Sequence, residues 1–328
     1  MTLNPDNRFG LSKRILLTGV SSFTGFWFAR RLVESGFSVS CPLPNIKKSY
    51  EGIKKTRLDT LPETVELFYN VPFGSVEFIN LLDGNFDKLC LHGAFVKGYQ
   101  NNEFTFGKAV GQNLNEIDRV FEKAKQNGCH GVIWTSSIFE DAVNTDEEFL
   151  KGSAFPWLKY ALSKKISYLS AREIALNSGL SFVRYVIPNP FGPYEDKKLT
   201  FHIIKSLHLG NDVSLKTPYY IRDMIHIEHL ASDYVRAIQS LDDLCDCSTV
   251  RPSEYSLSII EFATILCDEY NKRFGTNHKV LKSEQDNYRE PESMINNQNV
   301  RLSLPDYDDA KCWDRLFEYY GDYKYLCD

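Results

Sequence analysis

The chain has 328 residues, of which 43% are hydrophobic and 25% charged, a composition typical of a soluble globular protein. Its net charge of −5 argues against a nucleic-acid partner, and no apolar segment is long enough to span a membrane. The first residues lack a signal-peptide pattern, and the eight cysteines are scattered without metal-ligand spacing. We therefore expect a reduced, cytoplasmic protein without a metal, built as one large or two modest domains.

Strand and helix patterns alternate through the first half of the chain. Short apolar runs predict strands at 15–17, 37–41, 65–69, 89–92, 131–134 and 181–187. Helical patterns cover 25–35, 113–126 and 160–177. Such alternation indicates an α/β protein with a doubly wound parallel sheet of the Rossmann type. Its ligands bind beyond the carboxyl ends of the strands.

The pattern changes after residue 187. Prolines, aromatic residues and loops dominate 188–222, and a strand at 224–227 with a helix to residue 237 looks like a return to the sheet. The tail from residue 251 is mixed, with a helix near 259–270. This pattern predicts two interleaved units. Residues 1–187 and 223–250 would form a dinucleotide-binding domain, and 188–222 and 251–328 a smaller substrate-binding cap.

A glycine turn joins the first predicted strand to the first helix. The run from Thr18 to Gly25 points backbone N–H groups and the positive end of a helix at one place, which suits a pyrophosphate. The commoner dinucleotide-binding pattern has a glycine where Ser22 stands. Many strand-to-helix turns without a ligand look similar, so this turn is evidence only in combination with other features.

Tyr160 and Lys164 stand four residues apart on one face of a predicted helix. An ammonium group near a phenol favours the phenolate, so this tyrosine can exchange a proton with a sugar hydroxyl while hydride moves to or from nicotinamide. Four other tyrosines have a lysine at the same spacing, and there an exposed helix face is the simpler interpretation. Tyr160 alone opens a long helix after a strand that ends in hydroxyls, where Ser137 can bond the same substrate oxygen.

Together these residues resemble the extended short-chain dehydrogenase/reductase family, which includes nucleotide-sugar epimerases, dehydratases and 4-ketoreductases. The resemblance covers residues 13–295, with the individual motifs in the family's order. The matching segments are Thr18–Gly25, His92-Gly93-Ala94, Asn113, Thr135-Ser136-Ser137, Tyr160 with Lys164, Pro188-Asn189-Pro190-Phe191-Gly192-Pro193, and Arg222-Asp223 with His226.

The resemblance implies catalytic roles for Ser137, Tyr160 and Lys164. It implies that NAD or NADP binds at Gly19, Ser22, Phe23, Thr24, Gly25, Asn70, His92, Gly93, Ala94, Asn113, Thr135, Ser136, Tyr160, Lys164 and Pro188. It implies that the substrate binds at Ser137, Asn189, Arg222 and Arg289. Either arginine would hold a diphosphate through its guanidinium fork, unless it is an ion-pair partner of Asp223 or Glu290. Relatives pair the helices near 113–126 and 160–177 across a two-fold axis, which implies a homodimer.

The departures from the family pattern also matter. Ile138 and Phe139 follow Ser137 where dehydratases have Asp-Glu, so elimination of water is disfavoured. The second strand runs into Cys41-Pro-Leu-Pro44 without an acidic residue for the ribose, so NAD and NADP both stay open. Lys47 and Lys48 follow, as partners of a 2′-phosphate or as solvated lysines. Arg184 lies two residues farther from the Asn189 loop than expected and receives no role.

We therefore expect a nucleotide-sugar epimerase or 4-ketoreductase that transfers hydride with the help of Tyr160. Two alternatives remain. One is an NAD(P)-dependent reductase or dehydrogenase of a substrate without a nucleotide. The other is a non-catalytic dinucleotide sensor, against which the intact Tyr160 and Lys164 pair argues.

Overall fold

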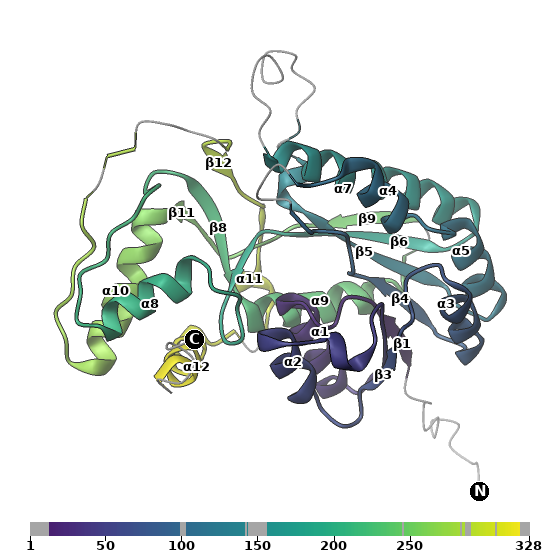
Figure 1. Cartoon of the computed structure of the whole chain (residues 1–328), viewed down its shortest axis with the longest axis horizontal. Coiled ribbons are helices and arrows are strands. Elements are labelled where there is room, and N and C mark those ends of the chain that lie inside the picture. Colours follow the sequence, from purple (N-terminus) through teal and green to yellow (C-terminus); the bar gives the residue numbers. More distant parts are fainter. Residues whose placement is uncertain are drawn as a thin grey trace, which may run out of the picture.

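A computed structural model describes residues 13–98, 103–141, 143, 156–244, 246–282, 284–285, 290–305 and 307–321. Figure 1 shows a layered unit of sheet and helices, with a smaller group of helices and strands beside it. Across these described ranges, no helix combines the length and the apolar character needed to cross a bilayer.

Seven parallel strands form the central sheet, in the order β3-β2-β1-β4-β5-β6-β9. They are β1 (Arg14–Leu17), β2 (Ser38–Leu43), β3 (Glu66–Tyr69), β4 (Lys88–Leu91), β5 (Gly131–Ser137), β6 (Ser181–Ile187) and β9 (Cys247–Val250). The strand order reverses between β1 and β4, and the carboxyl ends of these two strands open onto one crevice. The predicted doubly wound parallel sheet is confirmed.

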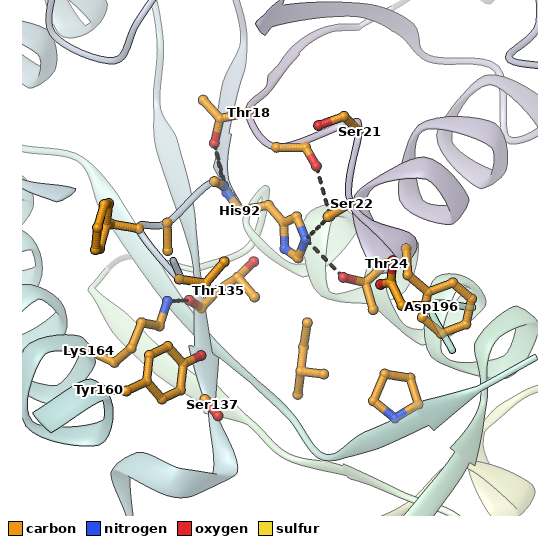
Figure 2. A pocket seen from close by; sticks show the side chains of 18 of the residues that line it. Thr18, Ser21, Ser22, Thr24, His92, Thr135, Ser137, Tyr160, Lys164 and Asp196 are labelled. Atoms are coloured by element: carbon orange, nitrogen blue, oxygen red, sulfur yellow. Dashed lines mark hydrogen bonds between the residues drawn. The ribbon is translucent and has the colours of Figure 1, made fainter. Parts of the chain in front are cut away.

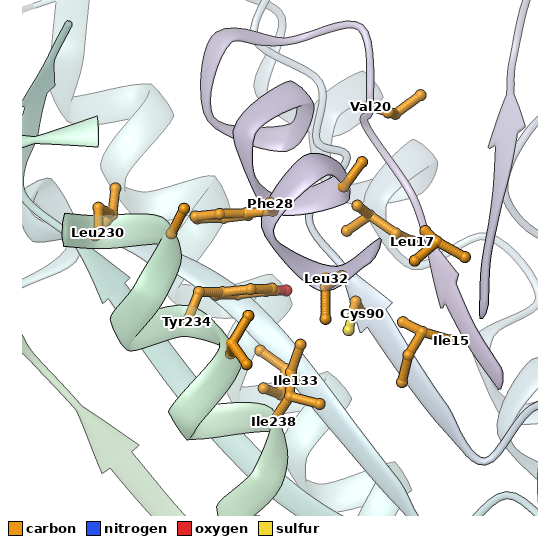
Figure 3. Close-up of a cluster of buried hydrophobic side chains, with 14 of the residues drawn as sticks. Ile15, Leu17, Val20, Phe28, Leu32, Cys90, Ile133, Leu230, Tyr234 and Ile238 are labelled. Carbon is orange, nitrogen blue, oxygen red and sulfur yellow. The ribbon is translucent and has the colours of Figure 1, made fainter. Parts of the chain in front are cut away.

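Helices cover both faces of this sheet. One face carries α1 (Phe23–Glu34) and α9 (Ile227–Ser240), and the other carries α3 (Val76–Leu81), α5 (Ile117–Gln126) and α7 (Pro156–Asn177). Ile15 packs in the first of these cores and Leu16 in the second, because successive side chains of a strand point to opposite faces. Figure 3 shows the first core, where Phe28 of α1 stacks on Tyr234 of α9 with ring centroids 3.8 Å apart.

A second sheet is built around β8 (Ile221–His226). This strand pairs with β7 (Asn189–Phe191), β11 (Tyr255–Ser258) and β12 (Ser293–Met294), while β10 (Pro252–Ser253) pairs with β13 (Gln298–Asn299) nearby. Three helices share a hydrophobic core with it: α8 (Leu199–His208), α10 (Ile259–Phe274) and α12 (Asp309–Gly321). The expectation that residues 224–227 rejoin the main sheet is therefore wrong. The return is made by α9 and β9.

Of the predicted helix at 113–126, only Ile117–Gln126 form α5, while Asn113 ends a separate helix, α4 (Phe106–Asn113). The backbone of Glu116 has φ +50°, in the left-handed region, and a right-handed helix cannot continue through such a residue. The apolar spacing predicts α5 correctly, but it does not reveal this break. The remaining elements of the described ranges are α2 (Gly52–Asp59), α11 (Val300–Ser303) and the short 3₁₀ turns η1 (Lys47–Ser49), η2 (Leu82–Gly84) and η3 (Ile138–Glu140).

Candidate active site

A cavity of about 1900 Å³ lies at the carboxyl ends of the central strands. Its wall includes the glycine turn, the ends of β2, β4 and β5, the start of α7, and residues of the second sheet such as Arg222. Pockets for one drug-sized ligand are about 300–1,000 Å³, so this cavity has room for a dinucleotide and a second ligand.

The glycine turn closes tightly against the start of α1. Gly19 has φ +78°, and a Cβ at Gly25 would lie 2.2 Å from the carbonyl oxygen of Gly19, so only glycine lets the helix approach this closely. Ser22 has an ordinary φ of −76° and caps the helix, since its Oγ accepts a hydrogen bond from the backbone N of Gly25 at 3.1 Å. The position therefore has no conformational need for glycine. Gly25 itself lies beneath the turn and outside the cavity lining.

His92 links the end of β4 to this turn (Figure 2). Its Nε2 lies 3.0 Å from Ser22 Oγ and 2.9 Å from Thr24 Oγ1, while Thr18 Oγ1 accepts hydrogen bonds from the backbone N of His92 and of Gly93. Burial lowers the pKa of His92 to about 3, and the charge of Lys164 contributes. The ring is neutral at physiological pH, so His92 organises the turn and is no candidate for acid–base chemistry.

The proposed catalytic residues meet where β5 faces α7. Figure 2 shows the phenol of Tyr160 beside Lys164 and directed toward the end of β5, where Ser137 lies. Tyr160 packs edge-to-face on Phe104, with ring centroids 6.0 Å apart. Lys164 is buried and donates from Nζ to the carbonyl oxygen of Thr135 at 2.6 Å. Burial lowers the pKa of Lys164, and the negative charge of Glu140 opposes this effect.

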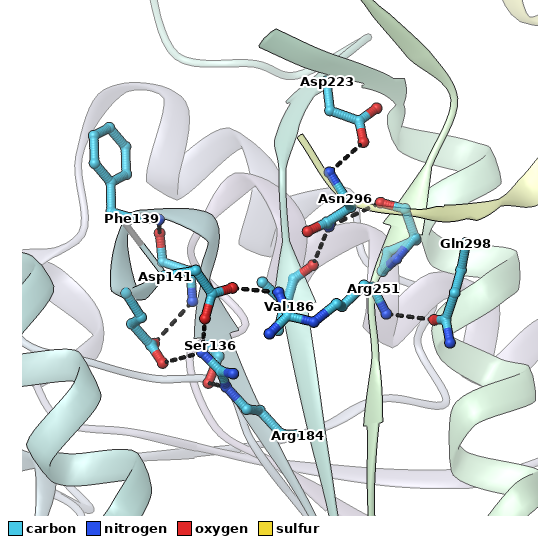
Figure 4. Close-up of polar contacts among 12 residues, drawn as sticks. Ser136, Phe139, Asp141, Arg184, Val186, Asp223, Arg251, Asn296 and Gln298 are labelled. Atoms are coloured by element: carbon cyan, nitrogen blue, oxygen red, sulfur yellow. Dashed lines mark hydrogen bonds and ion pairs between the residues drawn. The ribbon is translucent and has the colours of Figure 1, made fainter. Parts of the chain in front are cut away.

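A charged network missed by the sequence analysis lies behind these hydroxyls (Figure 4). Glu140 is fully buried, accepts a hydrogen bond from the backbone N of Ser137 at 2.9 Å, and pairs with Arg184 at 3.0 Å. Arg184 also donates to Ser136 Oγ at 3.2 Å. The sequence Ser137-x-x-Glu140 is a capping box, which could have revealed Glu140. Nothing local could have revealed Arg184, which comes from β6.

The substrate side of the cavity contains Pro188, Asn189 and Arg222. Arg222 Nη2 pairs with Glu290 at 2.9 Å, and Nη1 donates to the carbonyl oxygens of Pro291 and Glu292. Burial lowers the pKa of Arg222, while Glu290 raises it. The ion-pair interpretation of Arg222 thus has a partner in Glu290, and its role toward a ligand stays a prediction. Arg289 lies outside the described residues.

The end of the cavity near β2 differs from expectation. Asn70 is exposed and outside the lining, and Lys47 and Lys48 are also exposed and do not border the cavity. Instead α2 supplies Lys54 and Arg57. Arg57 is buried, donates to the carbonyl oxygen of Tyr194, and pairs with Asp196 at 3.1 Å. Arg57 is one of three basic residues in a polar helix, and nothing in the local sequence distinguishes it from the two lysines.

The remaining predicted residues are brought together. The cavity lining includes the following: Gly19, Ser22, Phe23, Thr24, His92, Gly93, Ala94, Asn113, Thr135, Ser136, Ser137, Tyr160 and Lys164. Asn113 is buried and its Oδ1 accepts from the backbone N of Phe95 at 2.9 Å, which holds the chain after β4 against α4.

A second cluster of titratable side chains lies outside the cavity lining. Potential ligand atoms of His226, Glu228 and Cys312 come within 4.8 Å of one another. Glu228 pairs through Oε2 with Arg315, and Cys312 Sγ lies 3.3 Å from Nε2 of His229, while His226 Nε2 and Glu228 Oε1 have no hydrogen-bond partner among the described residues. This cluster therefore joins α9 to α12 through hydrogen bonds and an ion pair.

Known proteins resemble this chain in sequence and in fold. The model of the NAD dependent epimerase/dehydratase family matches residues 15–246. An uncharacterized 37.6 kDa protein of Escherichia coli O111:H- is 22% identical over 232 residues, 68% of each chain. Dihydroflavonol 4-reductase of Callistephus chinensis is 22% identical over 256 residues, 71% of this chain and 63% of that protein.

Two solved structures illustrate the fold similarity. UDP-N-acetylglucosamine 4-epimerase from Methanobrevibacter ruminantium has a TM-score of 0.71 at 16% identity, covering 96% of this chain and 100% of that one. UDP-glucose 4-epimerase from Thermus thermophilus, in complex with NAD, has a TM-score of 0.65 at 17% identity, covering 94% and 99%. The family match spans most of the chain and includes both the glycine turn and the Tyr160–Lys164 pair, so the protein belongs to the NAD dependent epimerase/dehydratase family.

Proposed function

We propose that the protein is a nucleotide-sugar epimerase or 4-ketoreductase that moves hydride between a nicotinamide cofactor and a sugar carbon, with C4 as the favoured carbon. One observation carries the proposal: Ser137, Tyr160 and Lys164 line a single cavity that extends from the glycine turn to Arg222. That cavity suits two ligands, one at each end. The solved structures of similar fold support the proposal, because they are UDP-sugar 4-epimerases and one holds NAD.

The glycine turn fits a dinucleotide pyrophosphate. The first N–H groups of a helix have no partner within the helix, and Ser22 caps only that of Gly25. Phe23 and Thr24 border the cavity and leave their N–H groups for an anion. The end of β2 offers Pro44 and Asn45 where a carboxylate would select NAD, so the proposed cofactor is NAD or NADP.

The nicotinamide, when bound, supplies the hydride acceptor or donor. Tyr160 gives the proton to the sugar oxygen or takes it away, and the Ser137 hydroxyl orients that same oxygen. Lys164, as an ammonium group, favours the phenolate form of Tyr160 and can turn from Thr135 toward the ribose hydroxyls. His92 stays neutral and leaves the proton transfer to Tyr160.

We also propose a homodimer in the cytoplasm. Ile166 and Leu169 of α7 are 40% and 50% exposed and stand three residues apart, and Phe106 of the neighbouring α4 is 36% exposed. Such an apolar strip suits an isologous interface between two copies. The buried thiols of Cys41 and Cys90 suit a reducing compartment.

The proposed activity can be tested by offering purified protein a panel of nucleotide sugars with NAD, and 4-keto sugars with NADPH. Tyr160→Phe removes only the exchangeable proton, so cofactor binding should persist while turnover falls about 100-fold or more. Near wild-type turnover by this variant would show that Tyr160 is not the acid–base group.

A reductase of a substrate without a nucleotide is the second candidate. The similarity to dihydroflavonol 4-reductase favours it, as does the engagement of Arg222 by Glu290. Turnover of a carbonyl substrate with NADPH, together with no binding of any nucleoside diphosphate, would establish this candidate instead.

A further inference from the structure

Two opposite charges are buried directly behind the proposed catalytic hydroxyls. Glu140 is 0% exposed, and its two carboxylate oxygens accept from the backbone N of Ser137 at 2.9 Å and from Arg184 at 3.0 Å. The Arg184 guanidinium lies 4.4 Å from the ring of Tyr168 and donates to Ser136 Oγ at 3.2 Å. The pair therefore connects β5, β6 and α7 at the point where their polar groups reach the cavity.

Such a pair is a poor device for stability alone. Removing two charges from water costs about as much as their attraction returns, and apolar residues of similar volume often stabilise a fold as well or better. A buried pair does fix the orientation of its neighbours, because each hydrogen bond holds in place the group that it contacts. Here the contacted groups are the backbone of Ser137 and the hydroxyl of Ser136.

A third buried charge completes the arrangement. Lys164 of α7 is 5% exposed and is bonded to Thr135 O, one residue before Ser136. The titratable groups that act on its charge are Glu140 after β5, Arg184 on β6 and the neutral His92 after β4. Asp141 pairs with Arg184, and Arg251 pairs with Asp141 (Figure 4). The negative charge of Glu140 raises the pKa of Lys164 against the effect of burial, and Arg184 lowers it.

We propose that Glu140 is a positioning residue: it fixes the backbone of Ser137 and offsets the buried ammonium of Lys164, while Arg184 holds Glu140 in place. The inference rests on the proposed function, because the groups that Glu140 positions are the proposed catalytic ones. A merely structural role would hold the end of β5 together without any effect on the charge of Lys164.

The variant Glu140→Gln separates these two roles. It keeps an oxygen for the backbone N of Ser137, removes the negative charge, and replaces the oxygen that accepts from Arg184 with an NH2 group. Lysine labelled with ¹³C at Cε reports the protonation of Lys164 by NMR without substrate, and the signal is assigned by its loss in Lys164→Arg. We expect the midpoint of Lys164 to move to lower pH. Asp141→Asn is the matched control, because it makes the same change of charge one residue away without touching Ser137.

A double variant guards against loss of folding. Glu140→Gln leaves Arg184 with only the partly exposed Asp141 as an acidic partner, whereas Glu140→Gln with Arg184→Met removes both buried charges and should fold. Because the effects of Glu140 and Arg184 on Lys164 oppose each other, its midpoint should return toward that of the wild type. A Lys164 midpoint unchanged by Glu140→Gln, or moved equally by Asp141→Asn, would overturn the inference.

Activity gives a separate readout. If a substrate is turned over, the alkaline limb of kcat should move to lower pH in Glu140→Gln and not in Asp141→Asn, because neutral Lys164 no longer favours the phenolate. An alkaline limb of kcat that stays at the same pH in Glu140→Gln would count against the inference. Failure of every nucleotide sugar would instead count against the proposed function, and the NMR titration would still decide the role of Glu140.

Discussion

Arg222 offers the sharpest test of a diphosphate site, because its guanidinium is already engaged. It pairs with Glu290 at 2.9 Å, donates to three carbonyl oxygens, and lies 4.3 Å from the ring of Tyr220. A diphosphate that binds here must take the place of Glu290. Removing the acid and removing the arginine should therefore change the affinity for UDP in opposite directions.

The structure sets the size of both effects. The Glu290 side chain is 37% exposed, so its pair with Arg222 resembles a surface ion pair worth about 0.2–1 kcal/mol. Glu290→Gln should tighten UDP binding by at most about fivefold. Arg222→Met keeps an apolar stem against Tyr220 but loses a charge-assisted hydrogen bond worth about 1.5–3 kcal/mol, so UDP binding should weaken by about 10- to 150-fold.

Calorimetric titration with UDP, dTDP and GDP measures both effects, and the same titration with NADH should be unchanged in either variant. Tighter UDP binding by Glu290→Gln is the more informative of the two results, because damage to the site would only weaken UDP binding. If Arg222→Met binds UDP as well as the wild type, or Glu290→Gln binds it more weakly, the pair is purely structural. If the wild type binds no nucleoside diphosphate, the nucleotide-sugar proposal fails.

Two further variants test the turn and the assembly. Gly25→Ala should destabilise the fold by about 1–3 kcal/mol or more in denaturant titrations, because its Cβ would meet Gly19 O at 2.2 Å. Gly107→Ala in α4 has no atom within 4 Å of its Cβ and should be neutral or stabilising; equal effects of the two would refute the close-approach argument. Leu169→Glu places a charge in the exposed strip of α7 and should give a monomer by sedimentation, whereas a persistent dimer would place the interface elsewhere.

Local sequence patterns predicted most strands of the central sheet. They failed where contacts with residues distant in the sequence decide the structure. The run around Met224 correctly indicates a buried strand, but periodicity carries no information about which sheet receives it. Asn70 follows β3, where the resemblance implies a cofactor contact. Its backbone, however, has φ +59° and donates to Asn45 O, and the side chain is exposed. The turn geometry, which the sequence does not specify, decides that outcome.

The candidate site shows the same difference between residues that local sequence predicts and residues that only the fold brings together. Tyr160, Lys164 and Ser137 were predicted because their spacing and order are local, and the structure brings them to one cavity. Glu140 was missed although it forms a capping box with Ser137 only three residues away. Arg184 could not have been assigned from sequence, since its partner Glu140 is 44 residues distant and only the β5–β6 pairing brings them together.

The path of the chain restricts how chimeras of this protein can be designed. It leaves the central sheet after β6, returns at α9, and leaves again after β9, so the substrate side consists of two separate stretches. His226 ends β8 and caps α9, and its backbone N donates to Glu254 from the second stretch at 2.7 Å. A chimera that takes its substrate side from another protein therefore needs both stretches from the same donor. Contacts between the two stretches hold each of them to the part of the chain that carries the central sheet.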